Sequence, residues 1–162
     1  MFLNFDLERL IYVIPAIIIA LTFHEYAHAR IAYAFGDPTA KNEGRMTLNP
    51  LKHLDPIGTL LLIFAGFGWA KPVPVNPFYF QGNRKRKMLL VSLGGPAMNL
   101  LEAIAGAICF ALIYNFAPYN NVTIYFLNFF FYFLQINVVL AVFNILPIPP
   151  LDGSKILGAL LP

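Results

Sequence analysis

The sequence predicts an all-α polytopic membrane protein that forms one membrane-embedded unit over residues 1–162. Three observations support this fold class. Hydrophobic residues make up 59% of the chain and charged residues only 12%, which is about half the charged share of a soluble domain. The mean hydropathy is +0.67. Three apolar segments, 10–35, 88–116 and 122–146, are each long enough to cross a bilayer.

The composition also excludes other classes of protein. A disordered chain needs low hydrophobicity and many charges, and a soluble domain needs more polar residues for its surface. The net charge is +3, but four of the eleven basic residues form one run directly before an apolar segment, Arg84-Lys85-Arg86-Lys87. Such a run is typical of the cytoplasmic flank of a membrane span. We therefore expect the lipid bilayer, and no nucleic acid, as a partner of this chain.

The region between the first and second spans is less regular. Residues 36–56 are polar and rich in turn signals. The next apolar run, 57–70, is short for a spanning helix and suits a re-entrant, interfacial or strand segment. The prolines within 71–77 predict extended chain there. We expect residues 46–75 to form a membrane-associated β or re-entrant element.

The second and third spans each contain features that interrupt an apolar helix. Near the start of 88–116, the run Gly94-Gly95-Pro96 is expected to bend the helix or delay its start, and Glu102 is a lone carboxylate further along. The third span, 122–146, ends at three prolines, at positions 147, 149 and 150, just before Asp152. We expect these prolines to stop the helix.

The distribution of basic residues predicts the orientation of the chain. Eight of the eleven basic residues lie in 36–87, and the turn at 117–121 has none. Cytoplasmic loops carry the excess of Lys and Arg. We therefore expect a multi-pass protein of the plasma membrane with its N-terminus outside and 36–87 in the cytoplasm. This topology brings the end of the first span and Asp152 to the same side of the membrane.

The first span contains the motif His-Glu-x-x-His, formed by His24, Glu25 and His28. On a helix, residues four apart lie on one face, so the two imidazoles can bind one Zn²⁺ with the glutamate beside the metal. Zinc lowers the pKa of a bound water, and a nearby carboxylate can take its proton. The alternative is a structural polar cluster between helices, but charged and polar groups inside a membrane usually mark a functional site.

The motif supplies two metal ligands and a base, so a third ligand is required. The candidates from the residues alone are Asp37, His53, Asp55, Glu102 and Asp152. Asp152 is favoured because it follows a proline-rich break beside an apolar span, and membranes tolerate such breaks only where the backbone is buried in protein or lines a cavity.

Taken together, these motifs resemble the site-2 protease family of intramembrane zinc metalloproteases. Besides the histidine motif, the chain matches the family's N-x-x-P-x-P-x-x-D-G element from Asn144 to Gly153, and its G-P-x-x-N element from Gly95 to Asn99. Residues 49–58 and 68–75 resemble the short prokaryotic branch of the family that lacks a PDZ domain. The resemblance extends over about residues 20 to 158. Members of this branch usually continue with another hydrophobic segment, and the spans that carry the motifs are expected to complete the catalytic core.

The resemblance implies a role for each motif residue. His24, His28 and Asp152 would bind one Zn²⁺ per chain, and Glu25 would activate water. Asn144, and also Asn99, would contact the substrate, which would be a transmembrane segment of another protein. The region of 46–75 would form β structure that pairs with an unwound substrate. Such pairing would supply hydrogen-bond partners for the backbone groups that the substrate frees when it unwinds.

The resemblance therefore implies an intramembrane zinc endopeptidase with its active site towards the cytoplasm. The alternative is a non-catalytic membrane protein that binds or transports metal through the same ligands. Glu25 stands in the position of a base, and the chain has no internal inverted repeat of the kind that many transporters show. Both features favour the enzyme.

Overall fold

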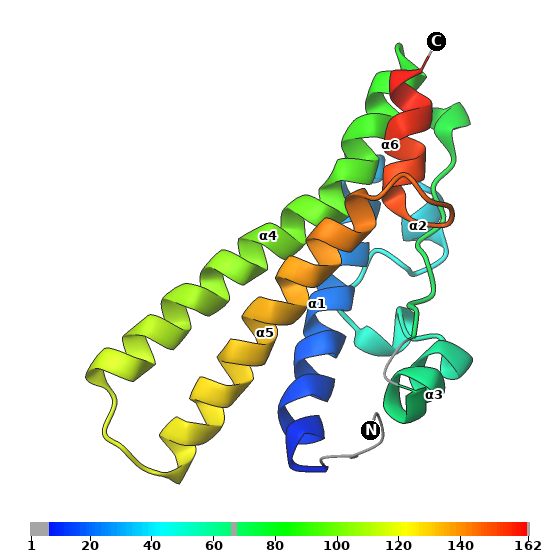
Figure 1. The fold of residues 1–162 in the computed structure, drawn as a ribbon. Helices are drawn as coiled ribbons and strands as arrows, with labels where there is room; N and C mark the ends of the chain where they lie inside the picture. The colour runs from blue at the N-terminus through cyan, green and yellow to red at the C-terminus, as the bar shows by residue number, and fades with distance from the viewer. Residues whose placement is uncertain (1–6, 66–67, 162) are drawn as a thin grey trace.

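The computed structural model describes residues 7–65 and 68–161, and its regular structure is helical (Figure 1). Three helices are long and apolar enough to cross a membrane, namely α1 (Leu7–Ala34), α4 (Arg84–Phe116) and α5 (Asn121–Ile145). They confirm the predicted class of three long apolar helices, within a few residues of the expected bounds.

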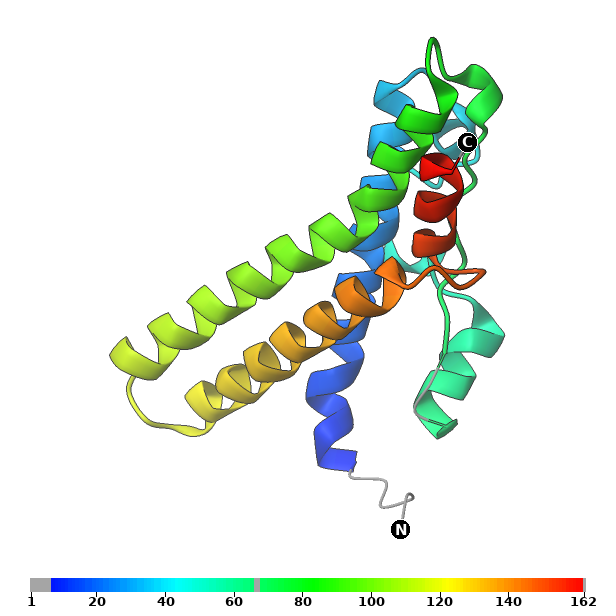
Figure 2. The same ribbon diagram turned by 45° about the horizontal axis from the view of Figure 1, so that its top comes forward.

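Shorter elements connect and flank the three long helices. They are α2 (Thr39–Asn42), the 3₁₀ turns η1 (Pro50–Lys52) and η2 (Pro77–Tyr79), α3 (Pro56–Ala65) and α6 (Asp152–Leu160). Each long helix packs against the other two, and α6 packs against α4 and α5. Figures 1 and 2 show α2 and α6 gathered at the end of the molecule where α1 finishes and α4 begins. This arrangement brings the last part of the chain to the C-terminal half of α1.

Polar caps and prolines set the limits of the long helices. Asn83 accepts a hydrogen bond from Arg86 N (2.9 Å) at the start of α4, and Asn120 accepts one from Thr123 N (3.0 Å) at the start of α5. Each bond satisfies a backbone donor that has no partner within the helix. Helix α5 stops at Ile145, because the prolines that follow cannot continue it.

The helices pack through small residues and expose large ones. Buried positions along α1 include Ala16, Ala20 and Ala27, whereas Leu101 of α4 and Val139 of α5 are among many large apolar side chains that remain exposed. Small residues allow helix backbones to approach closely in membranes. The exposed apolar side chains fit an exterior that faces lipid rather than water.

Helix α4 contains the run Gly94-Gly95-Pro96 without interruption, because it begins at Arg84 and continues to Phe116. The expected delay of the helix start is therefore wrong. Figures 1 and 2 show that α4 changes direction along its length. Proline inside a helix lacks a backbone donor and clashes with the preceding turn, so Pro96 accounts for a bend.

The expected membrane-associated β or re-entrant element over 46–75 is not supported. Within the described part of this stretch, which lacks residues 66–67, regular structure consists of η1 and α3, and the only strand-like pairing is a single antiparallel bridge between Leu54 and Ala70. Prolines begin both helical pieces, a position that suits them. Residues 71–76 belong to no helix or strand and run as an extended trace towards η2 (Figure 1), but Pro72 and Pro74 have no N–H for a β-ladder.

Candidate metal centre

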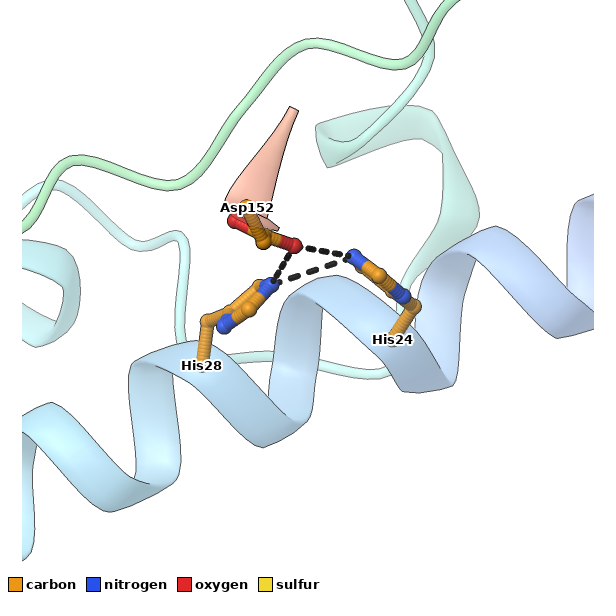
Figure 3. A group of neighbouring side chains, drawn as sticks. All are labelled: His24, His28 and Asp152. Carbon is orange, nitrogen blue, oxygen red and sulfur yellow. Dashed lines mark hydrogen bonds and ion pairs between the residues drawn. The ribbon is translucent and has the colours of Figure 1, made fainter. Parts of the chain in front are cut away.

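Three side chains from two distant parts of the chain meet at the C-terminal half of α1. His24 and His28 lie one turn apart on α1, and Asp152 is the first residue of α6 (Figure 3). Asp152 Oδ2 is 3.2 Å from His24 Nε2 and 2.9 Å from His28 Nε2, and the two Nε2 atoms are 3.1 Å apart. All three side chains are buried. Among the described residues they form a group whose ligand atoms all lie within 4.8 Å of one another.

The other ring nitrogen of each histidine is held by α4. His28 Nδ1 donates to the carbonyl oxygen of Val91 (2.7 Å), and His24 Nδ1 lies 2.6 Å from Asn99 Oδ1. Asn99 Nδ2 faces the carbonyl of Ala20, which can only accept, so Oδ1 is the atom that faces His24. Both Nδ1 atoms are therefore donors. This leaves the Nε2 lone pairs of both histidines directed at Asp152.

The chemistry of this donor set fits a metal ion. The two Nε2 lone pairs and the carboxylate oxygen face a common point, and none of these three atoms carries a hydrogen that it could donate to another. Such a set repels itself unless a proton or a cation lies between its members. Two imidazoles with a carboxylate are ligands that Zn²⁺ accepts, and three protein ligands leave a position open for water. The backbone and amide contacts at Nδ1 are the outer contacts that ligating histidines normally make.

Asp152 has a second contact that keeps its carboxylate charged. Lys155 Nζ, one turn along α6, lies 3.1 Å from Asp152 Oδ1. Burial raises the pKa of Asp152, but hydrogen bonds from His24 and His28, when a proton lies on their Nε2 atoms, and the charge of Lys155 outweigh burial and hold that pKa well below its usual range. The carboxylate is therefore ionised at neutral pH and can act as a ligand through Oδ2.

Glu25 lies beside the three side chains and is 8% exposed. Its Oε2 accepts a hydrogen bond from the backbone N–H of Val73 (2.8 Å). Glu25 also lines a cavity of about 270 Å³ together with His24, His28 and Asp152. The carboxylate is thus held at one oxygen by the segment after α3 and faces the same space as the histidines.

Two glycines allow the elements to approach this closely. A Cβ on Gly95 would lie 2.5 Å from His24 Nε2 and would also meet His28 Nε2, so a side chain there would occupy the space between the ring nitrogens. A Cβ on Gly153 would meet the carbonyl oxygens of Ile145 and Leu146 at the end of α5. Gly153 therefore lets α6 pack close enough for Asp152 to reach α1.

The two expected substrate-binding asparagines occupy different places. Asn144 lines the cavity and is partly exposed, and its Nδ2 donates to the Leu140 carbonyl (3.0 Å). Asn99 is fully buried behind His24, and its Nδ2 donates to Asn137 Oδ1 (2.8 Å). Only Asn144 therefore faces the cavity directly.

The other candidates for a third ligand are engaged elsewhere. Asp37 accepts hydrogen bonds from Thr39 and from the backbone N–H of Asn76. His53 Nε2 donates to the Thr47 carbonyl. Asp55 accepts from Gly58 N in the first turn of α3. Glu102 is buried in α4 and, within the described part of the chain, its Oε2 has no hydrogen-bond partner. None of these four belongs to the group formed by the two histidines and Asp152.

Sequence reasoning missed several contributors to this site. Lys155 is three residues after Asp152 on a helix, and this spacing predicts a contact between them, so it could have been found. The Val91 carbonyl and the Val73 N–H are backbone groups, and no side-chain pattern in the sequence could identify them.

Comparison with known proteins places this arrangement in a family. The model of peptidase family M50 matches residues 113–162. The chain is 45% identical over 163 residues to "Putative zinc metalloprotease YwhC" of Bacillus subtilis (strain 168), covering 99% of this chain and 74% of that relative. No solved structure gives a significant match.

Two further relatives carry similar names. "Putative zinc metalloprotease Rip2" of Mycolicibacterium smegmatis is 35% identical over 159 residues, with 94% of this chain and 57% of the relative covered. "Putative zinc metalloprotease MJ0611" of Methanocaldococcus jannaschii is 30% identical over 156 residues, with 95% and 73% covered. The similarity thus extends over nearly the whole chain, including both parts that form the candidate metal centre, and we conclude that the chain belongs to peptidase family M50.

Proposed function

We propose that this protein is an intramembrane zinc endopeptidase that cleaves peptide bonds in or near transmembrane segments of other proteins. The observation that carries the proposal is the convergence of His24, His28 and Asp152 with Glu25 beside them, in a cavity among helices long enough to span a membrane. The names of the relatives support zinc as the metal. One ion per chain would be held by the two Nε2 atoms and Asp152 Oδ2.

A zinc ion held in this way would lower the pKa of a bound water and polarise the substrate carbonyl. Glu25 is the group of this chain that moves protons. Its Oε2 is engaged by the Val73 N–H, which leaves Oε1 to take a proton from the attacking water. Glu25 then gives that proton to the amine that leaves, as a general base that becomes a general acid.

Asn144 is proposed to hold the substrate, because it lines the cavity and retains polar atoms that can bind a peptide backbone. A substrate helix hides its amide groups, so it must unwind before cleavage, and its freed groups then need polar partners. The proposed location is the plasma membrane, with the N-terminus outside and the site facing the cytoplasm, as the basic residues of 36–87 predict.

The proposal is tested with the purified protein in proteoliposomes that contain a transmembrane reporter substrate. Glu25→Gln should retain one zinc per chain and lose cleavage, because the amide cannot accept the proton. Glu43→Gln is the matched control, because Glu43 is exposed in the loop after α2 and its change should leave cleavage intact. Normal cleavage by Glu25→Gln would overturn the mechanism.

The metal-transport alternative makes a different prediction for the same preparation. A transporter should move zinc across the liposome membrane, and the reporter should remain whole. The position of Glu25 beside the histidines disfavours this reading, since a metal site without catalysis needs no base there. Zinc flux without cleavage by the wild-type protein would replace the enzyme proposal with the transporter.

A further inference from the structure

A proline-rich segment runs beside the candidate metal centre and touches the proposed base. We call residues 71–76 the strap. Pro72, Val73 and Val75 line the cavity, and Val73 N–H donates to Glu25 Oε2. Pro72 and Pro74 keep the segment extended, because proline restricts both its own backbone and that of the residue before it.

Two buried charged side chains hold the strap at its two ends. Arg45 Nη2 donates to the carbonyl oxygens of Lys71 (2.6 Å) and Pro72 (3.3 Å) at the start. Asp37 Oδ2 accepts from the backbone N–H of Asn76 (2.6 Å) at the end. The exposed fractions are 6% for Arg45 and 1% for Asp37. The contact with Glu25 lies between these two anchors.

Both anchors of the strap are charged side chains that are buried. Burying a charge is costly unless it is well hydrogen-bonded, and within the described residues neither Arg45 nor Asp37 forms an ion pair. Arg45 Nη2 donates to backbone carbonyls of the strap, while its Nε has no hydrogen-bond partner within the described residues. Asp37 accepts from the strap through Oδ2 and from Thr39 N through Oδ1. Hydrogen bonds with one charged partner are shorter and stronger than neutral ones. The two anchors therefore hold this backbone more firmly than a neutral turn would.

We propose that Arg45 and Asp37 are positioning residues for Glu25, acting through the strap. By fixing both ends of residues 71–76 they place the Val73 N–H against Glu25 Oε2, and this contact orients Oε1 towards the water that Glu25 deprotonates. The inference rests on the proposed role of Glu25 as the base. It gives a function to two buried charges that neither the metal ligands nor the substrate contact explains.

The strap has a property that makes its attachment measurable. Proline has no backbone N–H, so Val73 is the only residue between Lys71 and Val75 that carries an exchangeable backbone amide. Hydrogen exchange at this amide therefore reports directly on the contact with Glu25. As a calibration, Glu25→Ala should speed exchange at Val73 and leave the Asn76 amide, which Asp37 binds, protected.

The test compares Arg45→Gln with Arg45→Lys, Asp37→Asn and the control Lys52→Gln. The control removes a positive charge from the same loop at an exposed position. For Arg45→Gln we expect exchange at Val73 to rise at least about tenfold and turnover at saturating substrate to fall by about tenfold to a hundredfold, the cost of misplacing a catalytic group. Zinc content should stay at the wild-type value, because the ligands are untouched. Arg45→Lys should recover part of both losses, and Asp37→Asn should act in the same direction as Arg45→Gln.

Two results would overturn the inference. Wild-type exchange at Val73 in both Arg45→Gln and Asp37→Asn would show that these side chains do not hold the strap. Fast exchange with wild-type turnover would show that the strap does not position Glu25. If Arg45→Gln fails to fold, Arg45→Lys and Asp37→Asn decide the same two questions. A wild-type protein that binds zinc but cleaves nothing would instead refute the proposed function, and the exchange data would still decide whether Arg45 holds the strap.

Discussion

Asn99 provides the sharpest test of how the metal centre is built. The resemblance to site-2 proteases suggested a contact with substrate, but in the structure Asn99 is fully buried and lies behind His24. Its Oδ1 accepts from His24 Nδ1, and its Nδ2 donates to Asn137 Oδ1. We predict that Asn99 supports zinc binding by fixing the His24 ring, and that Asn99→Leu, which has a similar volume, weakens zinc binding.

The structure supplies the expected magnitude. Asn99→Leu leaves two buried groups without partners, the His24 Nδ1–H and Asn137 Oδ1, and each unsatisfied group costs about 1–3 kcal/mol. The free energy of unfolding should therefore fall by about 2–6 kcal/mol. Only the His24 contact acts on the metal. Loss of such an outer contact typically weakens metal binding by about 10- to 100-fold, which agrees with the cost of one unsatisfied group, since about 1.4 kcal/mol corresponds to a factor of ten.

The assay is competition for zinc between the purified protein in detergent and a chelator of known affinity. Asn137→Leu is the matched control, because it removes the partner of Asn99 Nδ2 and leaves the contact between Asn99 and His24 in place. It should reduce stability but keep zinc affinity within about threefold of wild type, well below the effect of losing an outer contact. Asn99→Asp retains an acceptor for His24 and should bind zinc better than Asn99→Leu.

The outcome that contradicts this reasoning is clear. If Asn99→Leu binds zinc as tightly as wild type, His24 does not depend on Asn99 for its orientation. If, in addition, KM for the reporter substrate rises, then the contact with substrate that the resemblance implied is the correct role.

Two further predictions use the same competition assay. Lys155→Met should weaken zinc binding by about tenfold, because the ligating carboxylate loses its outer contact, whereas Lys155→Arg should keep the wild-type affinity. The charge of Lys155 also lowers the pKa of Asp152. Zinc should therefore be released at a higher pH in Lys155→Met, because protons compete for a more basic carboxylate. Unchanged affinity and an unchanged pH of release would show that this contact is incidental. Gly95→Ala should prevent zinc binding, because its methyl group would lie among the ring nitrogens. The control Gly158→Ala places a methyl group in open space and should bind zinc normally. A Gly95→Ala protein that keeps full zinc affinity would mean that α4 does not approach the histidines this closely.

Local patterns predicted the long helices well. A long apolar stretch in a membrane has to satisfy its backbone groups internally, and the helix is the way to do so within one segment. The end of α4 and the bounds of α5 followed from the same pattern, including the prolines after α5, but the asparagine caps were not predicted and α4 begins at Arg84 rather than at residue 88. The spacing of His24 and His28 is likewise a property of one helix and requires no tertiary information.

The segment between α1 and α4 was predicted poorly, and its composition explains why. An apolar run such as 57–65 is compatible with either a strand or a helix, and periodicity alone cannot separate them. The structure forms α3 there, starting at Pro56. The prolines beyond Trp69 gave extended chain as expected, but they deny it the donors of a sheet. The result is a single extended strap held by Asp37, which precedes α2, and Arg45, which follows it.

By itself the sequence determined that the chain is a bundle of apolar helices with two imidazoles and a carboxylate on one helical turn, because both properties depend only on residues close together in the chain. It left five residues open as the third ligand. Only the tertiary structure brought Asp152, 128 residues away from His24, to the two Nε2 atoms, and placed Asn99 behind the imidazole and Val73 on Glu25. Such contacts depend on how α4 and α6 pack against α1. Small residues such as Gly95 and Gly153 allow this close packing, and prolines extend the backbone that carries Val73. The pattern within any one segment does not show these tertiary contacts.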